Sequence, residues 1–172
     1  MARLQKFPTL SVIIPTLNEA THLPLLLADL KAWPYDFNLT IVDGGSKDLT
    51  VSIAQINGAN IFKSLERNRG SQLKIGALKA EGDWLLFLHA DSRLGEKWFK
   101  SLLEIIQKKS SKSFVWYFDF KIKKHRLEFR ILELAVALRS YFLQKPYGDQ
   151  GLLIHKDLYF LSGGFSDLKI ME

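Results

Sequence analysis

The first hundred residues alternate short apolar runs with longer stretches in which apolar residues recur every three or four positions. Short runs rich in apolar and β-branched residues predict strands at 9–14, 39–42 and 59–62, and the unbroken apolar run at 84–88 predicts a strand buried on both faces. The intervening stretches show helical spacing, most clearly at Leu23, Leu26, Leu27, Leu30 and Trp33. Strands separated by helices predict an α/β fold, with a mainly parallel central sheet and helices on both faces.

Further predicted helices are marked by short sets of apolar residues. One carries Ile53 and Ile56, with Ser46 as its expected N-cap and Asp48 in its first turn. Others are expected through Leu73 and Ala77, and from Phe99 to Ile106.

The second half of the chain has a different pattern. Residues 113–122 alternate apolar and polar, which predicts a half-exposed antiparallel strand. Residues 125–144 have helical spacing with a wide apolar face, which would be buried against the sheet, in a homodimer contact or on a membrane surface. With no linker in view, residues 1–172 are expected to form a single domain.

Composition removes several classes of function. The chain has no cysteine, which excludes disulfides, thiolate metal sites and a cysteine nucleophile. No apolar run reaches the ~20 residues that span a bilayer, and the apolar N-terminal stretch is interpreted as the first strand rather than a signal peptide.

The net charge of +6 lies mostly in the second half, where residues 96–172 hold fourteen Lys/Arg and nine Asp/Glu, against ten and nine in residues 1–95. This surplus is either a solvated face or an attraction to anionic lipid or a polyanionic substrate. It lacks the interleaved aromatic residues of a nucleic-acid platform, so no nucleic-acid partner is expected.

Polar residues concentrate where the predicted strands end. In a parallel α/β sheet the ligand lies beyond the carboxyl ends of the strands, which selects the loops at 15–20, 43–48 and 89–95. Asp91 closes one buried strand and could hold a divalent cation, with His89 pointing the same way; the alternative is an Asx turn or helix cap. Asp43 could accept hydrogen bonds from a ribose or base, with Gly45 allowing close backbone approach, or could be a turn residue.

Two later polar groups allow similar alternatives. Arg69 and Gln72 would contact a phosphate or base, or would form an exposed helix start. Asp149 and Gln150, set among glycines, would shape an acceptor pocket or simply a turn.

Four segments in this order resemble family 2 glycosyltransferases with a GT-A fold: SVIIPTLNEA, IVDGGSKDLT, RNRGSQLKIGALKAEGDWLLFLHADSRL and PYGDQGLLIHKDLYFLSGGFSDLKIME. More narrowly, they resemble the bacterial radical-SAM/selenodomain-associated transferase 2 subgroup, from about Leu10 to Glu172. The resemblance implies a nucleotide-diphosphate sugar donor, Mg²⁺ or Mn²⁺ as cofactor, inverting transfer, and a lipid, saccharide or small-molecule acceptor. It also implies a cytoplasmic protein, with peripheral association at the inner face of the plasma membrane as an open alternative.

Carried over by position, the resemblance assigns roles to single residues. Pro15, Thr16, Asn18 and Glu19 would line the nucleotide pocket, and Asp43 would contact the base or ribose. His89–Asp91 takes the place of the Asp-x-Asp metal motif, and Asp149 and Gln150 would lie near the donor sugar or acceptor.

The chain departs from the family pattern at its end. The family typically has Glu-Asp after the GGF segment, with the aspartate as base, and this chain ends at Glu172. Residues 1–95 are therefore expected to form a nucleotide-sugar-binding half, and 96–172 an acceptor-side half that is cut short, with Glu172 and Asp149 as candidate catalytic carboxylates. The two hypotheses are a sugar-transferring enzyme and an impaired remnant that binds nucleotide sugar or a partner. A nucleotidyltransferase is set aside because PTLNEA is not a glycine-rich, basic loop.

Overall fold

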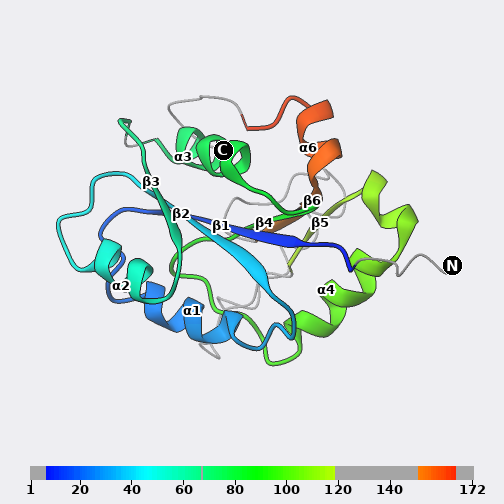
Figure 1. The fold of residues 1–172 in the computed structure, drawn as a ribbon, viewed down its shortest axis with the longest axis horizontal. Coiled ribbons are helices and arrows are strands. Elements are labelled where there is room, and N and C mark those ends of the chain that lie inside the picture. Colours follow the sequence, from blue (N-terminus) through cyan, green and yellow to red (C-terminus); the bar gives the residue numbers. More distant parts are fainter. Residues whose placement is uncertain (1–6, 67, 119–150, 166–172) are drawn as a thin grey trace, which may run out of the picture.

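The computed structural model describes residues 7–66, 68–118 and 151–165. Helices and strands alternate through the first hundred residues, as the apolar pattern predicts (Figure 1). In chain order the elements are β1 (Leu10–Thr16), α1 (Leu23–Leu30), β2 (Phe37–Asp43), α2 (Thr50–Ile56), β3 (Asn60–Lys63), α3 (Arg69–Lys79), β4 (Trp84–Phe87), α4 (Trp98–Gln107), the 3₁₀ helix η1 (Lys109–Ser113), β5 (Val115–Tyr117), β6 (Leu152–His155) and α6 (Lys156–Leu161).

The strands form a six-stranded sheet in the order β3-β2-β1-β4-β6-β5. The first four are mutually parallel, and the register places Thr16 at the end of β1 beside Asp43 at the end of β2. Strand β6 runs antiparallel to both β4 and β5, and its first residue, Leu152, pairs with Phe87 at the end of β4. The prediction of a mainly parallel sheet is confirmed.

Helices cover both faces of this sheet, with α1, α2 and α4 on one side and α3 and α6 on the other (Figure 1). Strand β1 supplies alternate residues to the two cores: Val12 and Ile14 face α1, and Ile13 faces α3. All three are fully buried, which is why the run in the sequence is apolar without interruption.

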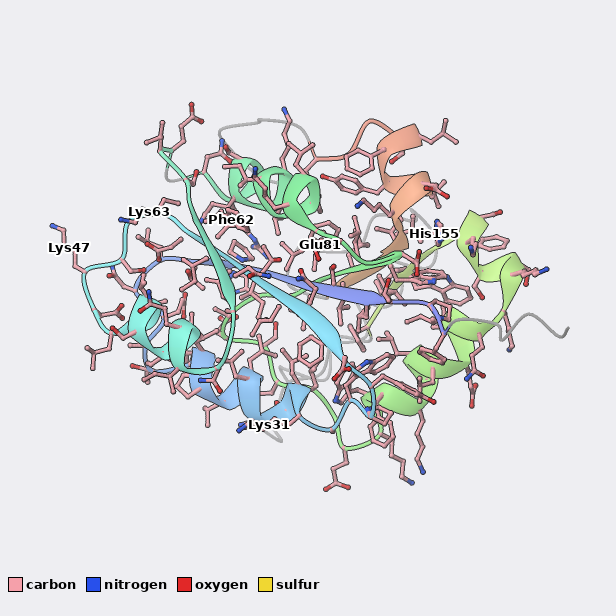
Figure 2. All side chains as sticks on the ribbon, in the orientation of Figure 1. Lys31, Lys47, Phe62, Lys63, Glu81 and His155 are labelled. Carbon is pink, nitrogen blue, oxygen red and sulfur yellow. The ribbon has the colours of Figure 1, made fainter. Side chains whose placement is uncertain are left out.

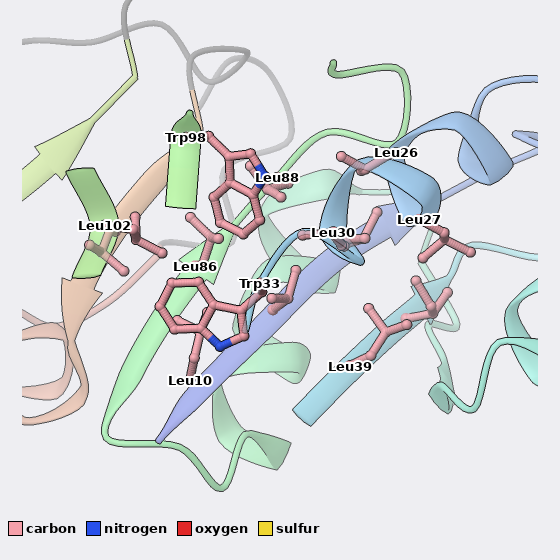
Figure 3. Close-up of a cluster of buried hydrophobic side chains, with 14 of the residues drawn as sticks. Leu10, Leu26, Leu27, Leu30, Trp33, Leu39, Leu86, Leu88, Trp98 and Leu102 are labelled. Carbon is pink, nitrogen blue, oxygen red and sulfur yellow. The ribbon is translucent and has the colours of Figure 1, made fainter. Parts of the chain in front are cut away.

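The larger core is built between α1, α4 and the strands beneath them (Figure 3). Leu26, Leu30 and Trp33 pack over Leu10 and the neighbouring strands, as the helical spacing of these residues predicts. The ring of Trp33 stacks on Trp98, with centroids 5.7 Å apart, so this contact joins the end of α1 to the start of α4.

On the opposite face, α3 lies very close to β1 and β2. A Cβ atom added at Gly76 would stand 2.3 Å from Cγ2 of Ile13 and 3.3 Å from Cγ2 of Val42. Only glycine permits this approach, and the approach in turn brings Gln72, one turn earlier in α3, over the ends of both strands.

Three predicted elements differ from the structure or fall outside its described part. The expected N-cap Ser46 is wrong: α2 begins at Thr50, after Leu49, and Ser46 instead hydrogen-bonds to Asp43. The strand expected at 113–122 begins as η1 and becomes β5 only at Val115, although its antiparallel pairing is confirmed. Residues 119–122 and the helix predicted at 125–144 lie outside the described residues, and no helix in the described part is long and apolar enough to cross a membrane.

Candidate functional site

The three loops selected from the sequence lie at the carboxyl ends of three neighbouring strands. Thr16 ends β1, Asp43 ends β2 beside it, and His89 follows β4 on the other flank of β1. The backbone N–H of Leu88 donates to the carbonyl oxygen of Ile13 at 3.0 Å, which continues the pairing of β4 up to His89. Lys47 and Lys63 project outward near the carboxyl ends of β2 and β3, away from His155 at the other end of the sheet (Figure 2).

Asp43 is buried, with 2% of its surface exposed, and its carboxylate organises the loop that follows β2. Oδ1 accepts hydrogen bonds from the hydroxyls of Thr16, at 3.1 Å, and Ser46. Oδ2 accepts from the backbone N–H groups of Gly45 and Ser46, each at 2.9 Å, and Gly45 reaches this position with a φ of +94°. Four donors fill the acceptor positions of an ionised carboxylate, so in this conformation Asp43 and Gly45 serve the loop itself.

The loop after β1 is tied to the loop after β2. The Asn18 N–H donates to Ser46 Oγ, and Asn18 Oδ1 accepts from the Lys47 N–H, both at 2.8 Å. Asn18 has a φ of +57°, a left-handed conformation that asparagine tolerates better than most residues. The Glu19 N–H donates to Thr50 Oγ1 at 2.8 Å, and one oxygen of the Glu19 carboxylate lies 3.2 Å from His22 Nδ1. Pro15, one residue before Thr16, is buried within β1.

Asp48 completes this connection between the first two loops. Its carboxylate accepts the N–H of Ala20 at 3.0 Å and the N–H of Thr50 at 3.0 Å. The hydrogen bond from the Thr50 hydroxyl is the main influence that lowers the pKa of Asp48 below its ordinary value. The charged form is therefore favoured where it holds the two loops together at the start of α2.

Gln72 links the ends of β1 and β2 from above. Its Nε2 donates to the carbonyl oxygens of Thr16, at 3.0 Å, and Val42, at 2.8 Å, and the side chain is buried. Arg69 is the first residue of the same helix, α3, and Asn68 caps it by accepting the N–H of Ser71. Gln72 thus braces the ends of β1 and β2 beneath the first two loops, a role that the sequence pattern does not reveal.

His89 and Asp91 converge as the sequence predicts. Nδ1 of His89 lies 2.6 Å from Oδ1 of Asp91, and the Asp91 side chain is 55% exposed while that of His89 is 25% exposed. A hydrogen bond from the Ser92 N–H to the His89 carbonyl oxygen, at 3.0 Å, folds these residues into a turn. In the described part of the chain no group of three or more His, Cys, Asp or Glu side chains is placed to hold a metal ion.

The sequence analysis missed the attachment of this turn to α1. Arg93 donates to both carboxylate oxygens of Asp29, from Nε at 2.7 Å and from Nη2 at 3.0 Å. The only signal in the sequence was an arginine two residues after Asp91, since nothing marks Asp29 as its partner 64 residues away. Asp149, Gln150 and Glu172 lie outside the described residues, so their proximity to this site stays a prediction.

Comparison with known proteins gives a consistent result. The family model for "Glycosyl transferase family 2" matches residues 11–166. A Mycobacterium tuberculosis "PGL/p-HBAD biosynthesis glycosyltransferase" is 42% identical over 96 residues, which cover 52% of this chain and 38% of that protein. A Drosophila melanogaster "Dolichyl-phosphate beta-glucosyltransferase" is 34% identical over 99 residues, covering 48% of this chain and 30% of that protein. The chain thus spans less than half the length of these curated relatives.

Solved structures of glycosyltransferases share the fold. TarS from S. aureus superposes with a TM-score of 0.70 at 19% identity, covering 91% of this chain and 50% of that structure. The mannosyltransferase PcManGT from Pyrobaculum calidifontis, in complex with GDP-Man and Mn²⁺, gives a TM-score of 0.70 at 18% identity, covering 95% and 49%. These similarities confirm the predicted GT-A fold. With a family model that spans residues 11–166, the chain belongs to glycosyltransferase family 2.

Proposed function

We propose that this chain transfers a sugar from a nucleotide-diphosphate sugar to an acceptor, with inversion and with the help of a divalent metal. The observation that carries the proposal is the meeting of three polar loops at the ends of β2, β1 and β4, the edge at which α/β sheets bind ligands. Membership of glycosyltransferase family 2 supports the reaction class. Solved complexes of TarS with UDP-GlcNAc and of PcManGT with GDP-Man support the donor class.

In this proposal the first two loops form the nucleotide pocket. Pro15, Thr16, Asn18 and Glu19 line it from β1, and Asp43 with Gly45 lines it from β2. The hydrogen bonds between these loops already hold them in place, so little conformational entropy is lost when a nucleotide binds. A ribose or base that bonds to Asp43 replaces one of its four present donors.

His89 and Asp91 are the residues that would hold the metal. A carboxylate suits both Mg²⁺ and Mn²⁺, and the imidazole of His89 adds a nitrogen donor beside it, so both cations are candidates. The converging Nδ1 and Oδ1 atoms supply only part of a coordination shell, as is usual where ligand phosphates complete it. When bound, the metal supplies positive charge to the departing diphosphate.

We assign the proton transfer to carboxylates outside the described part of the chain. An acceptor hydroxyl loses its proton to a carboxylate, for which Asp149 and Glu172 are the candidates, and attacks the anomeric carbon. Arg69 and Gln150 would contact the donor. The cationic surplus of residues 96–172 supports an acceptor that is anionic or held at an anionic membrane surface on the cytoplasmic side.

Thermal unfolding with a panel of uridine and guanosine diphosphate sugars tests the binding step. A ligand at about 100 times its Kd stabilises the folded state by about 2.7 kcal/mol. We expect a donor to stabilise the wild type in the presence of Mn²⁺, and we expect Asp91→Ala to abolish this stabilisation. The control Asp36→Ala changes an exposed carboxylate before β2 and should leave the stabilisation intact. Release of free nucleotide diphosphate in the presence of acceptor extracts then tests transfer. Binding without any release would contradict the proposed reaction, and the absence of any stabilisation would contradict the donor class as well.

A further inference from the structure

The turn that carries His89 and Asp91 is attached to helix α1 by a fork of hydrogen bonds. Arg93 binds both oxygens of the Asp29 carboxylate, and Oδ2 of Asp29 also accepts the N–H of Leu94 at 3.0 Å. A bidentate guanidinium–carboxylate pair fixes orientation as well as distance. The Asp29 side chain is only 15% exposed, so water competes weakly for its oxygens.

Asp29 is itself held by the core beneath it. Its carbonyl oxygen accepts a hydrogen bond from Trp98 Nε1 at 3.2 Å, and the Trp98 ring stacks on Trp33. Both rings are buried between α1 and α4. The carboxylate that receives Arg93 therefore stands on a rigid base rather than on a mobile surface side chain.

The other end of the turn is fixed to the sheet. Leu88 pairs with Ile13 of β1, and Leu88 and Ala90 are buried. Only His89 to Ser92 lie between this anchor and Arg93. These four residues form a turn, in which the Ser92 N–H donates to the His89 carbonyl oxygen. The position of Asp91 is thus set from both sides, by β1 before it and by α1 after it.

We propose that Asp29 and Arg93 are positioning residues that hold His89 and Asp91 in the geometry that receives a metal–diphosphate. The inference rests on the proposed function and deepens it, because it assigns two further residues to the metal side of the site. Lysine cannot replace arginine here, since a single ammonium cannot donate along two parallel directions to both carboxylate oxygens. Loss of the fork would leave the first two loops joined, because the hydrogen bonds of Asn18 and Glu19 that join them run to Ser46, Lys47 and Thr50.

Isothermal titration calorimetry separates this role from a general contribution to stability. UDP and GDP are the probes, each titrated with Mn²⁺ and with EDTA, and the ratio of the two Kd values gives the metal enhancement. For Arg93→Lys and Asp29→Asn we expect this enhancement to fall by about 10- to 100-fold, the range for residues that orient metal ligands. Nucleotide affinity in EDTA should stay within twofold of the wild type. The matched control Asp36→Asn should leave both values unchanged.

The double variant Asp29→Asn/Arg93→Lys should lose no more enhancement than the worse single variant, because both changes break one fork. Circular dichroism and thermal unfolding establish that each variant is folded. If folded Arg93→Lys keeps the metal enhancement of the wild type, the positioning role is overturned, while the proposed function stands. Equal losses of affinity in Mn²⁺ and in EDTA overturn the positioning role too, since they would show a general structural effect. A wild type that binds neither nucleotide overturns the proposed function together with this inference.

Discussion

Replacing Gly76 with alanine should destabilise the protein, although alanine is the better helix former. The added methyl group would lie 2.3 Å from Ile13 Cγ2, where carbon atoms prefer about 3.5–4.0 Å, so the overlap exceeds about 1 Å. Ile13 cannot move aside, because it is fully buried in a strand paired on both edges. Helix α3 must instead shift away from the sheet, and Gln72 must shift with it.

The expected magnitude is the difference between two opposing effects. Overpacking of a buried site costs about 1–3 kcal/mol, and an overlap of this size lies at the upper end of that range. Alanine recovers about 1 kcal/mol relative to glycine in a helix interior. The net loss of about 1–2 kcal/mol should lower the Tm by about 2–8 °C for a domain of this size.

Urea and thermal unfolding measure this loss, with Gly95→Ala as the control. A Cβ atom at Gly95 would have nothing within 4 Å, so that variant should stay within about 0.5 kcal/mol of the wild type. In an Ile13→Ala background the Gly76→Ala change should become neutral or stabilising, because the obstructing methyl group is gone. Wild-type stability for Gly76→Ala alone would show that α3 does not approach β1 as closely as described.

Three further outcomes are expected. Asp43→Asn should lower the free energy of unfolding by about 1–3 kcal/mol in urea, because a neutral amide loses the charge-assisted hydrogen bonds that the N–H groups of Gly45 and Ser46 donate; unchanged stability would contradict the bonding around this carboxylate. Burial, reinforced by Lys112, lowers the pKa of His155, so the unfolded chain binds the proton more readily and stability should decline as the pH falls below about 6.5. Thermal unfolding of His155→Asn, which keeps a capping side chain, should show a flatter slope between about pH 5 and 7, and an equal slope would refute this origin. Gly164→Ala should be destabilising by thermal unfolding, because the residue has a φ of +65° and its Cβ would lie 2.8 Å from the Tyr159 ring; a neutral result would argue against this turn.

The alternation of strands and helices was predictable because buried positions are occupied by apolar residues, whose spacing can be recognised in the sequence. Val12, Ile13 and Ile14 are apolar in succession since β1 is covered on both faces. The loops at the strand ends were predictable for the same reason, because they are what remains polar between buried runs. The family resemblance is confirmed, and the narrower radical-SAM/selenodomain-associated subgroup stays a prediction.

The connections within the site were not predictable, because their partners are set by tertiary structure. Asp29 and Arg93 meet only once α1 and the turn after β4 have packed together. The Gln72 amide donates to carbonyl oxygens 30 and 56 residues away, and the pattern that predicts a ligand contact at this helix start gives no sign of these two bonds. Ser46 fits the pattern of a helix cap, but its Oγ accepts the N–H of Asn18 and its hydroxyl donates to Asp43, and the helix begins only at Thr50.

The placement of β6 between β4 and β5 has a consequence for how the chain is made on the ribosome. Strand β4 can join β1 once residue 87 has emerged, yet its other edge is covered only when residues 152–155 arrive. At about 5–20 residues per second, synthesis of the intervening residues takes roughly 3–13 s. Throughout that interval the backbone N–H and C=O groups of Trp84–Phe87 that later pair with β6 can pair with another nascent chain instead. Chaperones that bind nascent chains at the ribosome should therefore affect the yield of folded protein more than its final stability.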